Sequence, residues 1–140
     1  MKAGIRIWIV TIAVLFSMAL TACGSGEKAA DGNSKENSYR QVSQEEAQKM
    51  MDEETDYIIL DVRTQEEYAS GHIPGAICIP NETIGTDPIE ELPDKDQLIL
   101  VYCRSGNRSK QAAGKLADQG YTNIVEFGGI NTWTGNIVTE

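Results

Sequence analysis

Residues 98–109, with the sequence LILVYCRSGNRS, place one cysteine between an apolar run and a helical pattern. Leu98 to Tyr102 predict a buried strand. Small and apolar residues then recur at helical spacing, at Ser109, Ala112, Ala113, Leu116 and Ala117. Cys103 therefore ends a strand and precedes a helix, whose unpaired backbone N–H groups favour an anionic sulfur. With Arg104 and Arg108 nearby, we expect the thiol pKa to lie below its ordinary value of about 8.5.

The turn after Cys103 predicts an anion-binding site at the same place. Gly106 allows the backbone to curl so that several N–H groups point at one spot above the sulfur. A lone cysteine at a strand end is usually inert, but the two arginines, the glycine turn and the helix start all favour a thiolate here. The sequence thus predicts a nucleophile and an anion cradle together.

The rest of the domain alternates strands and helices. Ser43 with Glu46, and Thr64 with Glu67, fit capping boxes that begin two helices. Gly71 is expected to end the second helix. Further strands are predicted at 57–60, 76–79 and 123–127, a helical turn at 88–92, a helix ending at 120 and a break at 128–129. This order predicts an α/β fold with a mostly parallel central sheet, helices on both faces, and ligands at the carboxyl ends of the strands.

Residues 1–22 have the pattern of an export signal. Lys2 and Arg6 precede an apolar core, Ile7–Leu20, which is short for a bilayer span of roughly 20 residues. The segment 20–23, LTAC, resembles the lipobox of bacterial lipoproteins, in which Cys23 would carry lipid and become the first mature residue. An ordinary cleaved signal with an incidental cysteine is the alternative.

Residues 23–38 predict a flexible, lipid-anchored linker, since 24–38 contains no large apolar residue. Residues 39–140 then form one domain of usual size. Two of the 12 basic residues lie in 1–22, whereas all 21 acidic residues follow this segment. Residues 23–140 therefore have a net charge of −11. This charge argues against nucleic acid as a partner and against a basic membrane patch, which leaves a lipid anchor as the only membrane attachment. We expect the domain outside the cytoplasm, on the outer face of the bacterial cytoplasmic membrane or in the periplasm.

Several other polar residues have structural explanations that compete with catalytic ones. Asp61 and Arg63 lie between a strand and a helix, where capping and a local ion pair, such as Arg63 with Glu67, are expected. His72, the one histidine, is expected in a turn rather than in a catalytic dyad. Cys78 is expected to be a small buried strand residue, with a resolving thiol for Cys103 as the alternative. The aromatic residues Tyr102 and Trp133 are expected in the core.

Taken together, these motifs resemble the single-domain rhodanese family over about residues 41–138. The matching segments are Asp61-Val62-Arg63, Glu67-Tyr68, the run 71–77 (GHIPGAI), the run 103–109 (CRSGNRS), the run 128–130 (GGI) and Trp133.

The resemblance implies a rhodanese-like fold and a sulfurtransferase that uses no metal or organic cofactor. By this resemblance, Cys103 is the catalytic nucleophile, which takes sulfur from a small sulfane-sulfur donor and passes it to a thiol or another nucleophilic acceptor. The substrate-binding loop would consist of Arg104, Ser105, Gly106, Asn107 and Arg108. Its amides would stabilise a Cys103 persulfide, and its arginines would attract an anionic donor.

The composition and length of this loop narrow the expected chemistry. The best known thiosulfate-using loops have a basic residue in place of Ser105 and a threonine in place of Arg108, which argues against thiosulfate as the natural donor. Cysteine phosphatases of this fold place the arginine six positions after the cysteine, whereas Arg108 follows Cys103 by five. The smaller cradle suits a single sulfur atom better than a phosphate. Two other functions stay open: a thiol redox protein using Cys103, with or without Cys78, and a non-catalytic module that binds anions or a partner.

Overall fold

The computed structural model describes residues 38–140, and the predicted signal segment, Cys23 and almost all of the predicted linker lie outside them. A parallel five-stranded sheet forms the centre of the domain, in the order β1-β5-β4-β2-β3. Its strands are β1 (Arg40–Gln41), β2 (Tyr57–Asp61), β3 (Ile77–Cys78), β4 (Leu98–Cys103) and β5 (Ile124–Gly129). The helices are α1 (Gln44–Glu53), α2 (Gln65–Ala69) and α3 (Asn107–Asp118), with 3₁₀ turns η1 (Asn81–Thr83) and η2 (Ile130–Thr132). The predicted α/β fold with a parallel sheet is confirmed.

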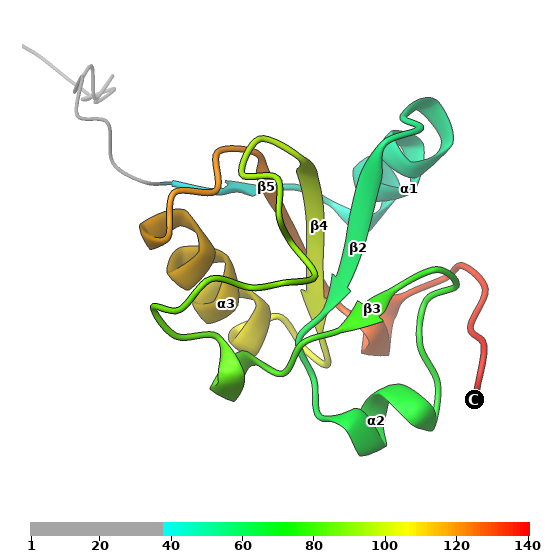
Figure 1. Cartoon of the computed structure of the whole chain (residues 1–140). Helices are drawn as coiled ribbons and strands as arrows, with labels where there is room; N and C mark the ends of the chain where they lie inside the picture. Colours follow the sequence, from blue (N-terminus) through cyan, green and yellow to red (C-terminus); the bar gives the residue numbers. More distant parts are fainter. Residues whose placement is uncertain (1–37) are drawn as a thin grey trace, which may run out of the picture. The chain divides into compact units, whose positions relative to one another are not determined.

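The alternation of side chains along β4 divides the core between the two faces of the sheet. Ile99, Val101 and Cys103 face the layer that contains α3, whereas Leu98, Leu100 and Tyr102 face the layer that contains α1. Figure 1 shows β4 in the middle of the sheet between these helices. Since both faces are covered, every residue of β4 is buried, as the continuous apolar run predicts.

The predicted helix starts are confirmed by their caps. Ser43 Oγ accepts the backbone N–H of Glu46 at 3.1 Å, and Thr64 and Glu67 form a complete reciprocal capping box. The N–H of Gly71 bonds to the carbonyl of Tyr68 just after α2, in agreement with the predicted end of this helix.

Three local features differ from the expectations. Strand β1 was not predicted, because two exposed residues carry no alternating pattern. Residues 88–92 form a turn closed by a bond from Leu92 N–H to the carbonyl of Ile89, and not a helical turn. Strand β5 continues through Gly128 and Gly129 where a break was expected, because its register shifts by one residue beside Cys103. Bulges of this kind re-aim side chains next to functional sites.

No helix among residues 38–140 has the length and apolar character needed to cross a bilayer.

Candidate functional site

Cys103 lies where strand β4 passes into α3, with its side chain on the α3-facing side of the sheet. Only 1% of the residue is exposed. Gly106 is the residue before α3 and has φ +103°, a left-handed conformation that glycine adopts without a steric penalty. The chain can therefore fold back over the sulfur within three residues.

The sulfur is held by hydrogen bonds within this turn. The N–H of Gly106 donates to Cys103 Sγ at 3.0 Å, and Ser109 Oγ lies 3.5 Å from Sγ. Burial alone would raise the pKa of Cys103. The Ser109 side chain and the backbone N–H groups of Ser109, Gly106 and Ser105 more than offset it, so the pKa lies below its ordinary value. The expected direction of the shift agrees with the structure, but its cause is hydrogen bonding rather than the two arginines.

Sequence reasoning missed two residues of this site, Ser109 and Glu126. Ser109 was assigned only to the buried face of the helix, and it is fully buried, but its hydroxyl approaches the sulfur. Glu126 lies 3% exposed in β5, and its Oε1 accepts the Ser109 hydroxyl at 2.6 Å. An acidic residue inside the apolar run 124–127 was the signal that could have found it.

The turn packs directly on the end of β5. A Cβ added at Gly129 would overlap the carbonyl of Arg104 and approach Ser105 Cα to 2.6 Å. The N–H of Asn131 also donates to the carbonyl of Arg104 at 3.2 Å. The lack of a side chain at Gly129 therefore allows the end of β5 to pack against the backbone of the turn.

The predicted loop residues differ in how they face the sulfur. Ser105 and Gly106 contribute N–H groups to it, as expected. Arg104 and Asn107 are exposed side chains on the same turn. Arg108 is the exception, because its guanidinium donates to both carboxylate oxygens of Glu67, at 2.7 and 2.9 Å.

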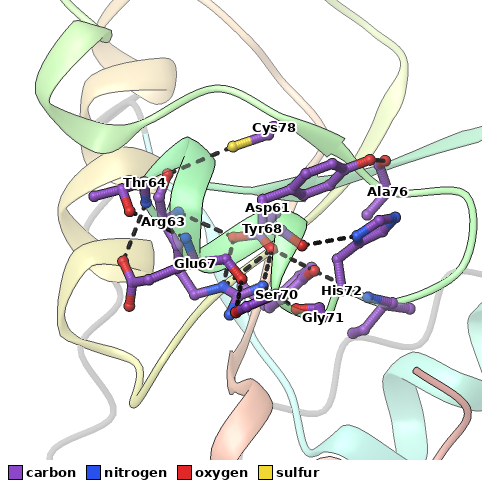
Figure 2. Close-up of polar contacts among 12 residues, drawn as sticks. Asp61, Arg63, Thr64, Glu67, Tyr68, Ser70, Gly71, His72, Ala76 and Cys78 are labelled. Carbon is purple, nitrogen blue, oxygen red and sulfur yellow. Dashed lines mark hydrogen bonds and ion pairs between the residues drawn. The ribbon is translucent and has the colours of Figure 1, made fainter. Parts of the chain in front are cut away.

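The same Glu67 carboxylate accepts the backbone N–H of Thr64 at 3.1 Å in the capping box of α2 (Figure 2). Chiefly because of the Arg108 bonds, the pKa of Glu67 falls from 4.5 to about 2. The charge of Arg108 is therefore neutralised by Glu67, while Arg104 is the exposed cation of the turn.

The expected ion pair between Arg63 and Glu67 is wrong. Arg63 pairs instead with Asp61, with Nη2 and Nε of Arg63 at 2.6 and 2.9 Å from its carboxylate oxygens, and both residues are buried. The hydroxyl of Tyr102 donates to the same carboxylate at 2.6 Å. Buried charges need such close partners. Tyr102 and Cys103 belong to the core clusters on opposite faces of the sheet, so this arrangement lies on the far face from the sulfur and has a structural role.

His72 also has the expected structural role. Its ring stacks on Tyr68 with centroids 3.7 Å apart, and Nδ1 lies 2.9 Å from the carbonyl of Tyr68. Figure 2 shows His72 among these turn residues. Tyr102 is fully buried and Trp133 packs against the same core cluster, as expected.

Cys78, half-buried in β3, is a free thiol, as is Cys103. Burial raises the pKa of Cys78 to about 11. Within residues 38–140 no group of three or more His, Cys, Asp or Glu side chains is arranged to hold a metal ion.

The rhodanese-like domain model matches residues 43–136, which include the whole of this site. The chain belongs to the rhodanese-like domain family. Among its relatives, a sulfurtransferase of Allochromatium vinosum is 42% identical over 90 residues, covering 62% of this chain and 79% of that protein. The thiosulfate sulfurtransferase GlpE of Coxiella burnetii is 33% identical over 103 residues, covering 73% of this chain and 94% of that protein.

Solved rhodanese structures share the fold. A rhodanese with anions from Escherichia coli superposes with a TM-score of 0.55 at 34% identity, covering 60% of this chain and 99% of that one. A rhodanese-like domain protein from Staphylococcus aureus gives a TM-score of 0.63 at 28% identity, covering 72% of this chain and 98% of that one. The rhodanese-like fold is therefore confirmed, and sulfurtransferase activity is supported at the level of the family.

Proposed function

We propose that the protein is a sulfurtransferase in which Cys103 carries the sulfur as a persulfide. The observation that carries this proposal is the N–H of Gly106, 3.0 Å from Cys103 Sγ at the bottom of a turn whose other amides also lower the thiol pKa. Fixed donors of this kind stabilise an anion without a rearrangement during the reaction.

The reaction consists of two displacements. The thiolate attacks the outer sulfur of a sulfane-sulfur donor, a bond forms between Sγ and that sulfur, and the donor's remaining fragment leaves with the electron pair of the broken bond. A nucleophilic acceptor, such as a thiolate, then attacks the outer sulfur of the persulfide, and the electron pair of the broken S–S bond returns to Sγ. Such covalent catalysis predicts ping-pong kinetics.

The burial of Cys103 bears on the class of donor. Because the residue is 1% exposed, a donor reaches it best with a slender terminal sulfur atom rather than with a bulky group. Arg104 is available to attract a negatively charged donor, whereas the charge of Arg108 is balanced by Glu67. Some relatives are named for thiosulfate, but Ser105 and Arg108 depart from the best known thiosulfate-using loops, which favours persulfides or polysulfides as natural donors.

A redox function with Cys78 as the resolving thiol is less well supported. In the sheet register, Asp61 of β2 lies opposite Cys78 of β3 on one side and opposite Tyr102 of β4 on the other. Two strand spacings therefore separate β3 from β4. At roughly 4.8 Å per spacing, Cys78 and Cys103 are about 10 Å apart at Cα, beyond the roughly 7 Å that a disulfide spans. The raised pKa of Cys78 also keeps its thiol protonated at neutral pH.

We further propose that the protein is exported and anchored through lipid on Cys23. The support is the sequence of residues 1–23 and the net charge of −11 beyond residue 22, which disfavours direct contact with anionic headgroups. Expression in bacteria with a radiolabelled fatty acid should label the protein, and Cys23→Ser should remove the label. An unlabelled chain found outside the cytoplasm would favour simple secretion.

Mass spectrometry of the full chain in detergent solution tests the persulfide. Incubation with thiosulfate, an alkyl persulfide or a polysulfide, each in turn, should add the mass of one sulfur atom to the peptide that contains Cys103. Cys103→Ser should abolish this gain, and Cys78→Ala should leave it unchanged. A chain that binds donors without ever gaining sulfur would favour the non-catalytic module.

A further inference from the structure

Glu126 is a buried acid to which the two displacements assign no role. It is 3% exposed within an apolar strand, and its carboxylate forms no ion pair with a Lys or Arg of residues 38–140. A buried, unpaired carboxylate is costly, and it is tolerated only with good hydrogen bonds. Its Oε1 accepts two, from the Ser109 hydroxyl at 2.6 Å and the Gly128 N–H at 2.8 Å.

The first of these bonds continues to the reactive sulfur. The thiol of Cys103 donates to Ser109 Oγ at 3.5 Å, and the Ser109 hydroxyl donates to Glu126. The carbonyls of Gly106 and Gly128 also lie near this hydroxyl, at 3.0 and 3.4 Å, but Glu126 is its nearest acceptor. A chain of donors therefore runs from Sγ through Oγ to a carboxylate.

The register shift in β5 brings the members of this chain together. Val101 pairs with Glu126 and Cys103 with Gly129, so β5 holds one more residue than β4 over this stretch. Val101 and Cys103 face α3, and Glu126 opposite Val101 faces the same side. Ser109, in the first turn of α3, lies between them.

We propose that Glu126 accepts the proton of Cys103 through Ser109, which deepens the proposed function and rests on it, because the thiolate is the attacking species. The S–H bond breaks as its proton binds Ser109 Oγ, and the original hydroxyl proton moves to Glu126 Oε1. The single negative charge passes from the carboxylate to the sulfur, where the Gly106 N–H stabilises it. During this transfer the buried turn therefore holds one negative charge and not two. Glu126 does not touch the sulfur and acts on it only through Ser109.

The far end of this chain opens toward water. Glu126 lines a pocket of about 470 Å³ between the start of α1 and the back of the turn, together with Ser43 and Gln44. A pocket of this size admits water, through which the carboxyl proton can exchange. The charged side chains on this pocket are Lys110 and Glu46, and on the side of the sulfur Arg108 is paired with Glu67.

The test is a pH titration of the Cys103 thiolate by its ultraviolet absorbance in the full chain, taken as the difference from Cys103→Ser. Two interacting acids that share one proton lose their protons in two macroscopic steps. We therefore expect the thiolate signal to rise in two steps. Glu126→Gln cannot accept a proton and should lose the lower-pH step, whereas Glu46→Gln removes the same charge from the same pocket and should keep both.

A single step in the unmutated chain, at any pH, would overturn the proposal, as would two steps that survive in Glu126→Gln. If Glu126→Gln does not fold, infrared spectroscopy of the unmutated chain decides. The band of a protonated carboxyl should persist through the first step and vanish with the second rise of thiolate; its complete loss in the first step contradicts the relay. The titration needs no sulfur donor, so it is independent of the loading assay. If Cys103 gains sulfur but titrates in one step, the relay is refuted and the sulfur transfer stands. If Cys103 titrates in two steps but never gains sulfur, the sulfur transfer is refuted and the relay stands.

Discussion

Glu67 and Arg108 are 41 residues apart and join the start of α2 to the start of α3 through two hydrogen bonds of 2.7 and 2.9 Å. The carboxylate that caps α2 thus also holds the arginine of the Cys103 turn. Both side chains are only about a quarter exposed, at 26% for Arg108 and 28% for Glu67. Bidentate pairs of this kind fix orientation as well as contributing energy.

Replacing Glu67 by Gln should lower the free energy of unfolding by about 1 kcal/mol at neutral pH, since the pair is partly exposed and the cap is weakened. Urea denaturation measures this difference. Glu66→Gln, an exposed change in the same helical turn, is the control and should change stability by less than half as much. Equal effects of the two substitutions would contradict a specific role for the pair.

The stabilisation by Glu67 should also depend on pH. Because folding lowers the pKa of Glu67 from 4.5 to about 2, its contribution is present above pH 4.5 and is lost as the pH falls toward 2. The difference in unfolding free energy between the unmutated chain and Glu67→Gln should therefore shrink over this interval. A difference that stays constant down to pH 2 would show that the carboxylate charge is not its source.

Replacing Gly129 by Ala should disrupt the cradle, because the added Cβ would overlap the backbone of Arg104 and Ser105. We expect the free energy of unfolding to fall by about 1–3 kcal/mol. We also expect most of the sulfur loading at Cys103 to be lost. Gly114→Ala in α3 meets open space and should stabilise the helix by about 0.5–1 kcal/mol without changing loading. Normal loading by Gly129→Ala would show that the turn does not depend on this close contact.

Replacing Gly106 by Ala should raise the pKa of Cys103. At φ +103° an alanine is strained by about 1–3 kcal/mol, and relief of that strain would turn the N–H away from Sγ. The rate of Cys103 alkylation against pH reports the shift. Gly85→Ala, at a turn with no close neighbour for a Cβ, is the matched control. An unchanged alkylation profile would mean that the other amides suffice.

Replacing Tyr102 by Phe should destabilise the fold by about 1–3 kcal/mol while leaving sulfur loading intact. The hydroxyl donates to buried Asp61 and accepts the N–H of Ile73 at 3.2 Å, so its removal leaves a buried donor unpaired. Thermal unfolding and the loading assay separate the two effects. Loss of loading at temperatures where the variant is folded would give this residue a functional role.

The sequence predicted those parts of the site that depend on local order. Cys103, Gly106 and Ser105 are neighbours along the chain, and a strand that passes into a helix through a glycine turn has few conformations available. The caps at Ser43 and Thr64 and the direction of the Cys103 pKa shift follow from the same local rules. Local rules did not predict the ion-pair partner of Arg63, because Asp61 and Glu67 were both within reach of its long side chain.

By itself, then, the sequence determined the alternation of strands and helices and the place of the reactive cysteine within them, since hydrophobic period and capping act over a few residues. Only the tertiary structure decided that Glu67 holds Arg108 and that Glu126 lies beneath Ser109. These partners are 41 and 17 residues apart, and their contact depends on strand order and on the register shift between β4 and β5. Register and packing are set by the whole core at once, and no local pattern encodes them.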